Sequence, residues 1–488
     1  LASQTDIQIP FTILKENIET ALEKINMGVF SSDLLSKLLV ISGMDWKKVY
    51  LLKALTSYLH QTGMMYGRTY VNLTLIKHHK FTESLVNFFD SLFNPESHSK
   101  KLAKSITNDI YTYLDTVSNS TEDKVLRSMH QTIDAIVRTN FYQTKNNEMK
   151  NYISFKFDSH KVPDLPLPRP YAEIFIYSNE FEGIHLRGGK VARGGIRWSD
   201  RGEDYRVEVL GLMKSQMTKN AVIVPVGSKG CFFLKFEQGI LSRMNYMEKV
   251  IGCYKNFLRG LLDLTDNLVN GKIIQPSKTV IHDDENPYLV VAADKGTATF
   301  SDYANQVSLE YNFWLGDAFA SGGSIGYDHK KMAITAKGAW ISAQSHFYDM
   351  GKNIQSEPFT VIGIGDMSGD VFGNGMLLSK SIKLIAAFNH MHIFIDPTPD
   401  ETLSYKERQR LFNLAGSKWS DYNPKLISEG GAVFERSAKI INISKEIQNV
   451  LNLDVISITP NDLIKAILKA NVDLLWNGGI GTYIKSSS

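Results

Sequence analysis

The spacing of the apolar residues changes near residue 150, and this change restricts the folds open to the chain. From about residue 12 to 145 the apolar residues recur at helical spacing, as in the stripe from Leu34 to Ile41. After residue 150 they alternate or form short runs, as in 152–157, 171–176 and 183–187, which is typical of strands. We therefore expect a helical N-terminal region followed by α/β structure.

Strands and helices are predicted in turn beyond residue 200. Helices are expected at about 204–220 and 243–264, and strands at 222–225, 230–236 and 288–293. From residue 288 onward the regular alternation favours a mostly parallel sheet.

A second α/β segment begins with a predicted helix over 337–347 and a strand over 359–363. A glycine-rich loop follows, then a predicted helix over 377–388 and a strand over 392–395 that ends on Asp396. A strand, a glycine loop, a helix and a strand in this order begin a dinucleotide-binding domain.

Three expected regions result. They are a helical N-terminal region (1–148), a substrate-binding catalytic α/β domain (149–335) and a Rossmann-type dinucleotide-binding domain (336–488), the last expected to be incomplete at its C-terminal end.

Composition argues against several classes of protein. A net charge of +3 over 488 residues, with no basic run, does not indicate a nucleic-acid partner. Cys231 and Cys253 are too few for a disulfide framework or a tetrahedral metal site, so we expect no metal and a cytoplasmic location. No apolar run reaches the ~18 residues that a membrane span requires. The absence of an initial Met and the motif at the very end lead us to expect an interior piece of a longer protein.

Four cations lie close together in sequence, between residues 193 and 229: Arg193, Arg197, Lys219 and Lys229. Glycines and apolar residues stand between them, whereas a solvated basic surface normally mixes in acids. Glycines let a small anionic ligand approach the backbone while the cations bind it. This stretch therefore predicts a site for a small anion.

Lys229 and Asp294 are the candidates for proton transfer. Lys229 lies between small residues at what we interpret as a turn between two strands, where partial desolvation favours the neutral amine. Asp294 follows a predicted strand, at the edge where α/β active sites gather. A surface salt bridge for Lys229 and an N-cap for the helix near Phe300 for Asp294 are the alternatives.

The glycine loop at 363–369 has the spacing G-x-G-x-x-x-G. Such a loop allows a tight turn and seats a pyrophosphate on a helix N-terminus. Asp396 would accept hydrogen bonds from the adenosine ribose and repel a 2′-phosphate, which favours NAD over NADP. The alternative is that Asp396 caps a loop before Pro397.

The order of these motifs resembles the glutamate dehydrogenase superfamily. Three longer sequence segments resemble the large NAD-specific bacterial glutamate dehydrogenases. These segments are Arg-Gly-Gly-Ile-Arg-Trp-Ser-Asp-Arg (193–201), Tyr-Asp-His-Lys-Lys-Met-Ala-Ile-Thr-Ala-Lys-Gly-Ala-Trp (327–340) and Trp-Asn-Gly-Gly-Ile-Gly-Thr-Tyr (476–483). The resemblance covers nearly the whole chain, and those enzymes are much longer.

The resemblance implies a role for each matching residue. Lys229 and Asp294 would be the catalytic lysine and aspartate, and Lys219 would bind the α-carboxylate of the substrate. Arg193 stands where the superfamily has a lysine for the side-chain carboxylate; the change keeps the charge and adds a bidentate fork. The residues implied in NAD binding are Thr335, Gly363, Gly365, Asp366, Met367, Ser368, Gly369, Asp396 and Asn477.

The resemblance also implies the reaction: NAD-dependent oxidative deamination of L-glutamate to 2-oxoglutarate and ammonium, in an enzyme that is a homo-oligomer at full length. Three alternatives stay open. The substrate could be another amino acid, although an apolar one would leave the charge of Arg193 buried and unpaired. The chain could be a non-catalytic regulatory module, or it could be inactive by itself.

Overall fold

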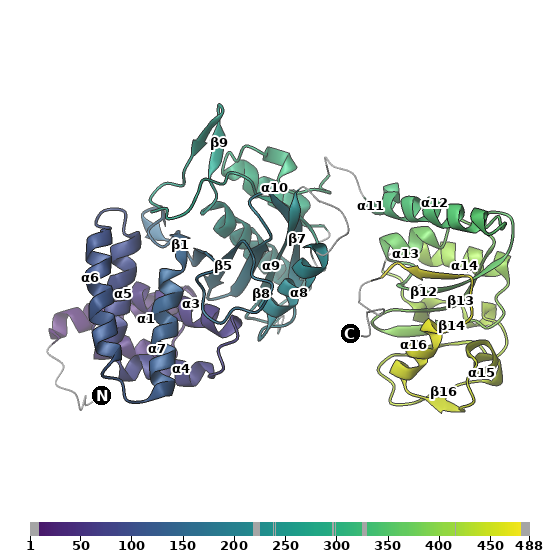
Figure 1. Ribbon diagram of the computed structural model, residues 1–488, viewed down its shortest axis with the longest axis horizontal. Helices are drawn as coiled ribbons and strands as arrows, with labels where there is room; N and C mark the ends of the chain where they lie inside the picture. Colours follow the sequence, from purple (N-terminus) through teal and green to yellow (C-terminus); the bar gives the residue numbers. More distant parts are fainter. Residues whose placement is uncertain are drawn as a thin grey trace. The chain divides into compact units, whose positions relative to one another are not determined.

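The computed structural model describes residues 9–217, 225–237, 239, 241–294, 297, 299–324, 329–414 and 416–479. The chain forms two compact units, Leu1–Gly326 and Tyr327–Ser488 (Figure 1). The helical region and the first α/β region thus belong to one unit.

Helices occupy the first part of this unit, as the apolar spacing predicts. They are α1 (Phe11–Asn26), α2 (Leu38–Ile41), α3 (Trp46–Gln61), α4 (Arg68–Lys77), α5 (His79–Phe93), α6 (Lys100–Leu114) and α7 (Ser120–Asp134). Helix α3 is buried along most of its length, and its Leu55 and Tyr58 share one hydrophobic core with Phe155 and Phe175 of the adjoining sheet. This shared core explains why the helices do not separate as a domain of their own.

A seven-stranded sheet forms the centre of the first unit. In spatial order its strands are β1 (Ile136–Thr139), β4 (Tyr152–Phe157), β5 (Ala172–Ser178), β6 (Phe181–Arg187), β8 (Val226–Leu234), β7 (Ala192–Ser199) and β11 (Val290–Ala293). Only the last three strands of this order run parallel to one another, and the pairs from β1 to β8 are antiparallel.

Helices cover both faces of this sheet. Helix α8 (Tyr205–Met217) packs on the same face as the N-terminal helices, whereas α9 (Arg243–Leu262) and α10 (Ser301–Glu310) bury the other face. Two small hairpins, β2–β3 (Thr144–Lys145, Glu148–Met149) and β9–β10 (Asn267–Val269, Lys272–Ile274), pair only within themselves, and the second stands out from the unit (Figure 1).

The second unit has three layers. Its sheet has the order β15 (Ala432–Glu435), β14 (His392–Ile395), β13 (Ile382–Phe388), β12 (Phe359–Ile364) and β18 (Leu474–Asn477). Helices α12 (Ile334–Asp349), α13 (Asp370–Gly375) and α14 (Glu401–Asn413) share a core on one face, and α15 (Lys445–Leu451) and α16 (Pro460–Leu468) share one on the other (Figure 1). Short elements complete the unit: α11 (His329–Met332) and the pair β16–β17 (Ile441–Asn442, Ser457–Ile458).

The predicted fold class, α/β with a helical N-terminal region, is confirmed, but two predictions about the second unit are wrong. Much of the segment predicted as a helix over 377–388 is strand β13, which runs parallel to β12. Strand β14 pairs with β13 antiparallel, so the sheet is mixed and not mostly parallel. The cause is that 382–388 is a short apolar run buried on both faces, and periodicity does not distinguish such a strand from a buried helix.

Among the described residues, no helix combines the length and the apolar character that crossing a membrane would take.

Candidate active site

Lys229 and Asp294 form a close ion pair in the first unit. The Nζ atom of Lys229 lies 2.6 Å from Oδ2 of Asp294, and the two side chains are 15% and 13% exposed. Lys229 belongs to β8, Asp294 directly follows β11, and β7 lies between these two strands in the sheet. The two side chains must therefore meet across the intervening strand.

Gly195 of β7 makes this meeting possible. It pairs with Ala292 of β11, and a Cβ atom on Gly195 would lie 2.8 Å from Cβ of Asp294 and 3.1 Å from Nζ of Lys229. Any larger residue would occupy the space that the ion pair uses. Gly195 thus gives room for the charged side chains of the protein, whereas the glycines were expected to let a small anionic ligand approach the backbone.

The turn expected around Lys229 does not exist. Lys229 lies within the nine-residue strand β8, and Gly194 and Gly195 lie within β7. Glycine in a strand interior marks a close approach of neighbouring groups as well as a turn, and sequence alone does not separate the two. At Gly194, for example, a Cβ would lie 1.5 Å from the carbonyl oxygen of Ser228.

The alternative role for Asp294, as the N-cap of the next helix, is also wrong. The N-cap position of α10 is Phe300, and no side chain among the described residues caps that helix end. The backbone N–H of Asp294 instead donates to Oγ1 of Thr297 (3.1 Å), and the Thr297 hydroxyl donates to the carbonyl of Ile196 in β7 (2.6 Å). Thr297 therefore ties the segment after β11 to the neighbouring strand, a role that the sequence analysis did not assign.

Arg193 lies on the same strand and face as Gly195, because residues two apart in a strand point to one side. Its side chain is exposed, and its Nη2 donates to Oγ of Ser321 at 2.7 Å. Ser321 gives the guanidinium a defined direction, and it too was missed by the sequence analysis. Lys219 and the strand predicted at 222–225 lie outside the described residues, except for Pro225.

A second cation reaches Asp294. Nη2 of Arg197 lies 3.3 Å from Oδ1 of Asp294, and Nη1 of Arg197 lies 2.5 Å from Oε1 of Glu208 in α8. Burial lowers the pKa of Arg197, but the hydrogen bond to Glu208 and the charge of Asp294 outweigh it and raise the pKa overall. Arg197 was recognised in the sequence only as one of four cations, without a role, and no pattern in the sequence singled out Glu208.

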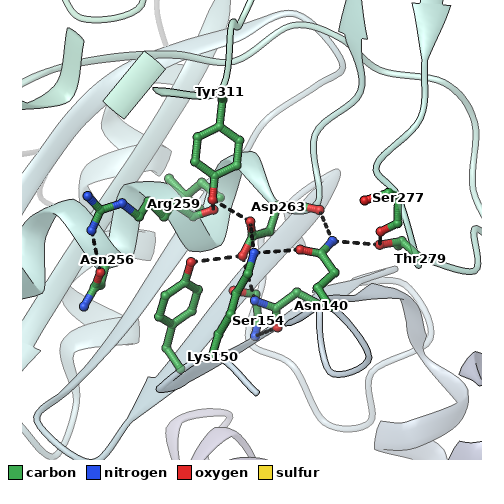
Figure 2. A network of polar contacts seen from close by, with 12 residues as sticks. Asn140, Lys150, Ser154, Asn256, Arg259, Asp263, Ser277, Thr279 and Tyr311 are labelled. Atoms are coloured by element: carbon green, nitrogen blue, oxygen red, sulfur yellow. Dashed lines mark hydrogen bonds and ion pairs between the residues drawn. The ribbon is translucent and has the colours of Figure 1, made fainter. Parts of the chain in front are cut away.

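A cavity with a volume of about 1070 Å³ lies elsewhere in the first unit. Figure 2 shows the polar network on its wall, in which Asp263 accepts hydrogen bonds from Lys150 (2.6 Å) and from the hydroxyl of Tyr311 (2.6 Å). Arg259 is paired with Glu310 at 2.9 Å. Because these charged groups already have partners, the network stabilises the junction of strands and helices. The cavity therefore provides no evidence about the chemistry at Lys229.

The glycine loop in the second unit joins β12 to α13. Gly365 has φ of +137°, a conformation that only glycine adopts readily. Gly363 lies in β12, and a Cβ there would lie 2.3 Å from the ring of Phe372. Asp366 closes the loop, because its Oδ1 accepts from the backbone N–H of Ser368 (3.1 Å) and of Gly369 (3.1 Å).

Three further residues predicted to bind NAD have defined places in this unit. Asn477 ends β18, pairs in register with Ile364 of β12, and so lies at the same edge as the glycine loop. The backbone at Gly479 is close enough that a Cβ would lie 2.9 Å from Cα of Gly365. Met367 is buried in the loop, and Thr335 is exposed in the first turn of α12.

Asp396 does not lie at this edge. It follows the antiparallel strand β14, and its backbone N–H donates to the carbonyl of Ile385 (2.8 Å), three residues before the end of β13. At about 3.3 Å per residue this is about 10 Å short of the strand end. Its side chain is fully buried, with Oδ1 accepting from the backbone N–H (3.1 Å) and the hydroxyl of Ser428. The expectation that Asp396 follows the next parallel strand is therefore wrong.

The surroundings of Asp396 also disfavour the ionised form of its carboxyl group. Among the residues that the structure describes, its Oδ2 has no hydrogen-bond partner. Burial raises the pKa of Asp396, and the hydrogen bonds from Ser428 only partly oppose this. The alternative that the sequence analysis left open, a local structural role beside Pro397, fits the hydrogen bonds to Ser428.

Comparison with known proteins agrees with the resemblance. Residues 30–95 match the family model for glutamate dehydrogenase, helical motif 3. The chain is 50% identical to the NAD-specific glutamate dehydrogenase of Halomonas elongata, covering 100% of this chain and 30% of that protein. It is 51% identical to that of Pseudomonas aeruginosa, covering 97% of this chain and 30% of that protein. The chain thus spans about 30% of the length of these relatives.

A solved Plasmodium falciparum glutamate dehydrogenase aligns with a TM-score of 0.38 and 13% identity, covering 98% of this chain and 78% of that one. The family model that covers most of the sequence is described as bacterial NAD-glutamate dehydrogenase, catalytic domain, and it matches residues 109–488. The chain belongs to this family.

Proposed function

We propose that this chain carries the catalytic core for NAD-dependent oxidative deamination of L-glutamate to 2-oxoglutarate and ammonium. The observation that carries the proposal is the Lys229–Asp294 pair, which meets across a strand at a position where only glycine fits. A partly buried amine and carboxylate in contact supply both an acid and a base for proton transfer.

The substrate's two carboxylates need two separated cations. We assign Arg193 to the side-chain carboxylate, because it is exposed on the strand that also carries Gly195 and its guanidinium is directed by Ser321. Lys219 is assigned to the α-carboxylate on family resemblance. Two such contacts would orient the α-carbon and so lower the entropic part of the barrier.

Lys229 and Asp294 divide the proton transfers. Asp294 accepts the proton of the substrate ammonium group, which leaves a neutral amine. Loss of the α-hydrogen as a hydride turns this amine into a carbon–nitrogen double bond. Lys229 then activates the water that attacks the double bond, and Asp294 returns a proton to the departing nitrogen. Water supplies the oxygen of the new ketone, and the nitrogen leaves as ammonium.

The second unit fits a dinucleotide. The backbone at Gly479 lies close to the backbone at Gly365, and neither residue has a side chain that covers it. Phosphates can reach backbone N–H groups at a surface of this kind. We assign the contacts to the loop 363–369, Asn477 and Thr335, and leave Asp396 out. NAD, when bound, supplies the acceptor for the hydride that leaves the α-carbon.

A homo-oligomer and a cytoplasmic location are part of the same proposal. Both rest on the family resemblance, and the second is also consistent with the free, buried thiols of Cys231 and Cys253.

NADH formation tests the proposal directly. We expect absorbance growth at the NADH band with L-glutamate, and much slower growth with norvaline, aspartate or leucine. The assay is run on the intact protein that contains this sequence and, separately, on residues 1–488 alone. Activity that favours an apolar amino acid would reject glutamate as the substrate, and no NAD-dependent oxidation of any amino acid by the intact protein would reject the enzymatic function.

A further inference from the structure

We propose that Arg197 is a positioning residue that holds the Asp294 carboxylate in its working orientation, and that Glu208 directs Arg197 into this contact. The inference rests on the proposed function, since it gives Asp294 a defined orientation for its proton transfers.

Asp294 contacts two cations. Its Oδ2 lies 2.6 Å from Nζ of Lys229, and its Oδ1 lies 3.3 Å from Nη2 of Arg197. A carboxylate held at both oxygens has a fixed plane as well as a fixed place. This matters because Asp294 follows the last residue of β11 and lies in no helix or strand.

The side chain of Arg197 is itself held in place by Glu208. Its side chain is 9% exposed, and Glu208, which is 12% exposed, accepts from its Nη1 at 2.5 Å. The other oxygen of Glu208 accepts from the hydroxyl of Ser199 at 2.7 Å, two residues farther along β7 on the same face. Glu208 thus lies between two groups of one strand, and α8 cannot move without disturbing the direction of Arg197.

The two cations, Lys229 and Arg197, differ in whether their charge changes during the proposed reaction. Lys229 changes its protonation state in the proposed reaction, so its attraction for Asp294 changes during the cycle. A guanidinium keeps its charge at every accessible pH. Arg197 therefore provides the constant charge that keeps Asp294 ionised and in place when Lys229 is neutral.

The charged groups that these contacts place around Asp294 come from three elements. They are Lys229 of β8, Arg197 of β7 and, behind Arg197, Glu208 of α8. Loss of the positive charge of Arg197 makes the ionised carboxylate less favourable, whereas loss of the negative charge of Glu208 makes it more favourable. The two variants should therefore shift the acidic limb of the pH–rate profile in opposite directions.

The test measures kcat, KM for L-glutamate, the pH profile of kcat and the melting temperature of the intact protein. For Arg197→Met we expect kcat to fall about 100-fold, as for a misplaced catalytic group, with KM within about threefold and the acidic limb moved to higher pH. Arg197→Lys should return the limb toward its original pH and recover part of kcat. Glu208→Gln should lower kcat about tenfold and move the limb to lower pH.

Arg201→Met is the matched control, because Arg201 is paired with Asp204 on the surface and is 47% exposed. Its kcat and pH profile should equal those of the unmodified protein. The inference is overturned if Arg197→Met keeps kcat within threefold and its pH profile unchanged, or if Arg197→Met and Glu208→Gln move the limb the same way. If Arg197→Met does not fold, Glu208→Gln decides, and an acidic limb that stays at its original pH in this variant overturns the inference. An intact protein without glutamate-dependent NADH formation would instead reject the proposed function itself.

Discussion

Gly195→Ala should disable the site with the addition of a single methyl group. The new Cβ would lie 2.8 Å from Cβ of Asp294, whereas carbon atoms in contact are normally about 3.5–4.0 Å apart. Asp294 must therefore retreat by about 1 Å, and the new methyl also lies 3.1 Å from Nζ of Lys229. A misplacement of this size costs about a factor of 100 in rate, or about 3 kcal/mol of barrier.

The effect on folding should be much smaller than the effect on turnover. Crowding in a packed site costs about 1–3 kcal/mol, but replacing glycine by alanine restricts the unfolded chain and returns about 0.4–1 kcal/mol. Steady-state NADH formation with L-glutamate gives kcat, and thermal unfolding followed by circular dichroism gives the melting temperature.

Gly211→Ala is the matched control. Gly211 lies in α8 with nothing within 4 Å of an added Cβ, so alanine there should leave kcat unchanged and stabilise the helix by up to about 1 kcal/mol. The reasoning is refuted if Gly195→Ala retains more than a tenth of the original kcat while it unfolds at the original temperature.

Three further predictions concern the side-chain carboxylate site, the second unit and the core. Arg193→Leu should reduce kcat/KM for glutamate by an amount equivalent to about 1.5–3 kcal/mol, the range for a hydrogen bond to a charged group, and should reduce kcat/KM for norvaline far less. The reason is that only glutamate loses a charged partner, and equal losses would mean that Arg193 does not bind the side-chain carboxylate. Asp396→Asn should raise the melting temperature at pH 7, because burial raises the pKa of Asp396 and its ionised form weakens the fold above that pKa. This gain in melting temperature should vanish as the pH falls below the ordinary pKa range of a carboxyl group. Asp396→Ser should leave the preference for NAD over NADP unchanged, which kinetics with both cofactors will check. His185→Leu should stabilise the protein increasingly below pH 6.5, by about 1 kcal/mol per pH unit in denaturant unfolding, because burial lowers the pKa of His185 to about 3 and only the unfolded chain takes up the proton between these values; parallel pH profiles of the two proteins would contradict this.

The sequence was sufficient to predict the fold class, and it singled out Lys229 and Asp294, which the structure brings into contact. The change of apolar spacing near residue 150 gave the helical and α/β regions, and the run of cations with glycines pointed to Lys229. These features are local, since each depends on neighbours within a few residues along the chain. The same holds for the glycine loop, whose positive φ at Gly365 and tight packing against Phe372 follow from its spacing.

Contacts between distant residues were beyond the sequence. Arg197 reaches Asp294 across 97 positions, and nothing in the local pattern of either residue identifies the other. The segment around Lys229 was interpreted as a turn because turns and crowded strands both favour small residues such as glycine. Asp396 was misplaced for a related reason: a strand of four residues carries no signal for whether it runs parallel or antiparallel to its neighbour.

The central claim is that Lys229 is the catalytic amine of a glutamate dehydrogenase, and Lys229→Ala tests it most directly. The measurement is kcat for NADH formation from L-glutamate in the intact protein, with the affinity for NAD measured by fluorescence titration as the control. We predict that turnover is lost while NAD affinity is nearly unchanged, because Lys229 lies in the first unit and the glycine loop in the second. Retention of more than about a tenth of the rate, equivalent to less than ~1.4 kcal/mol of barrier, would contradict the assignment.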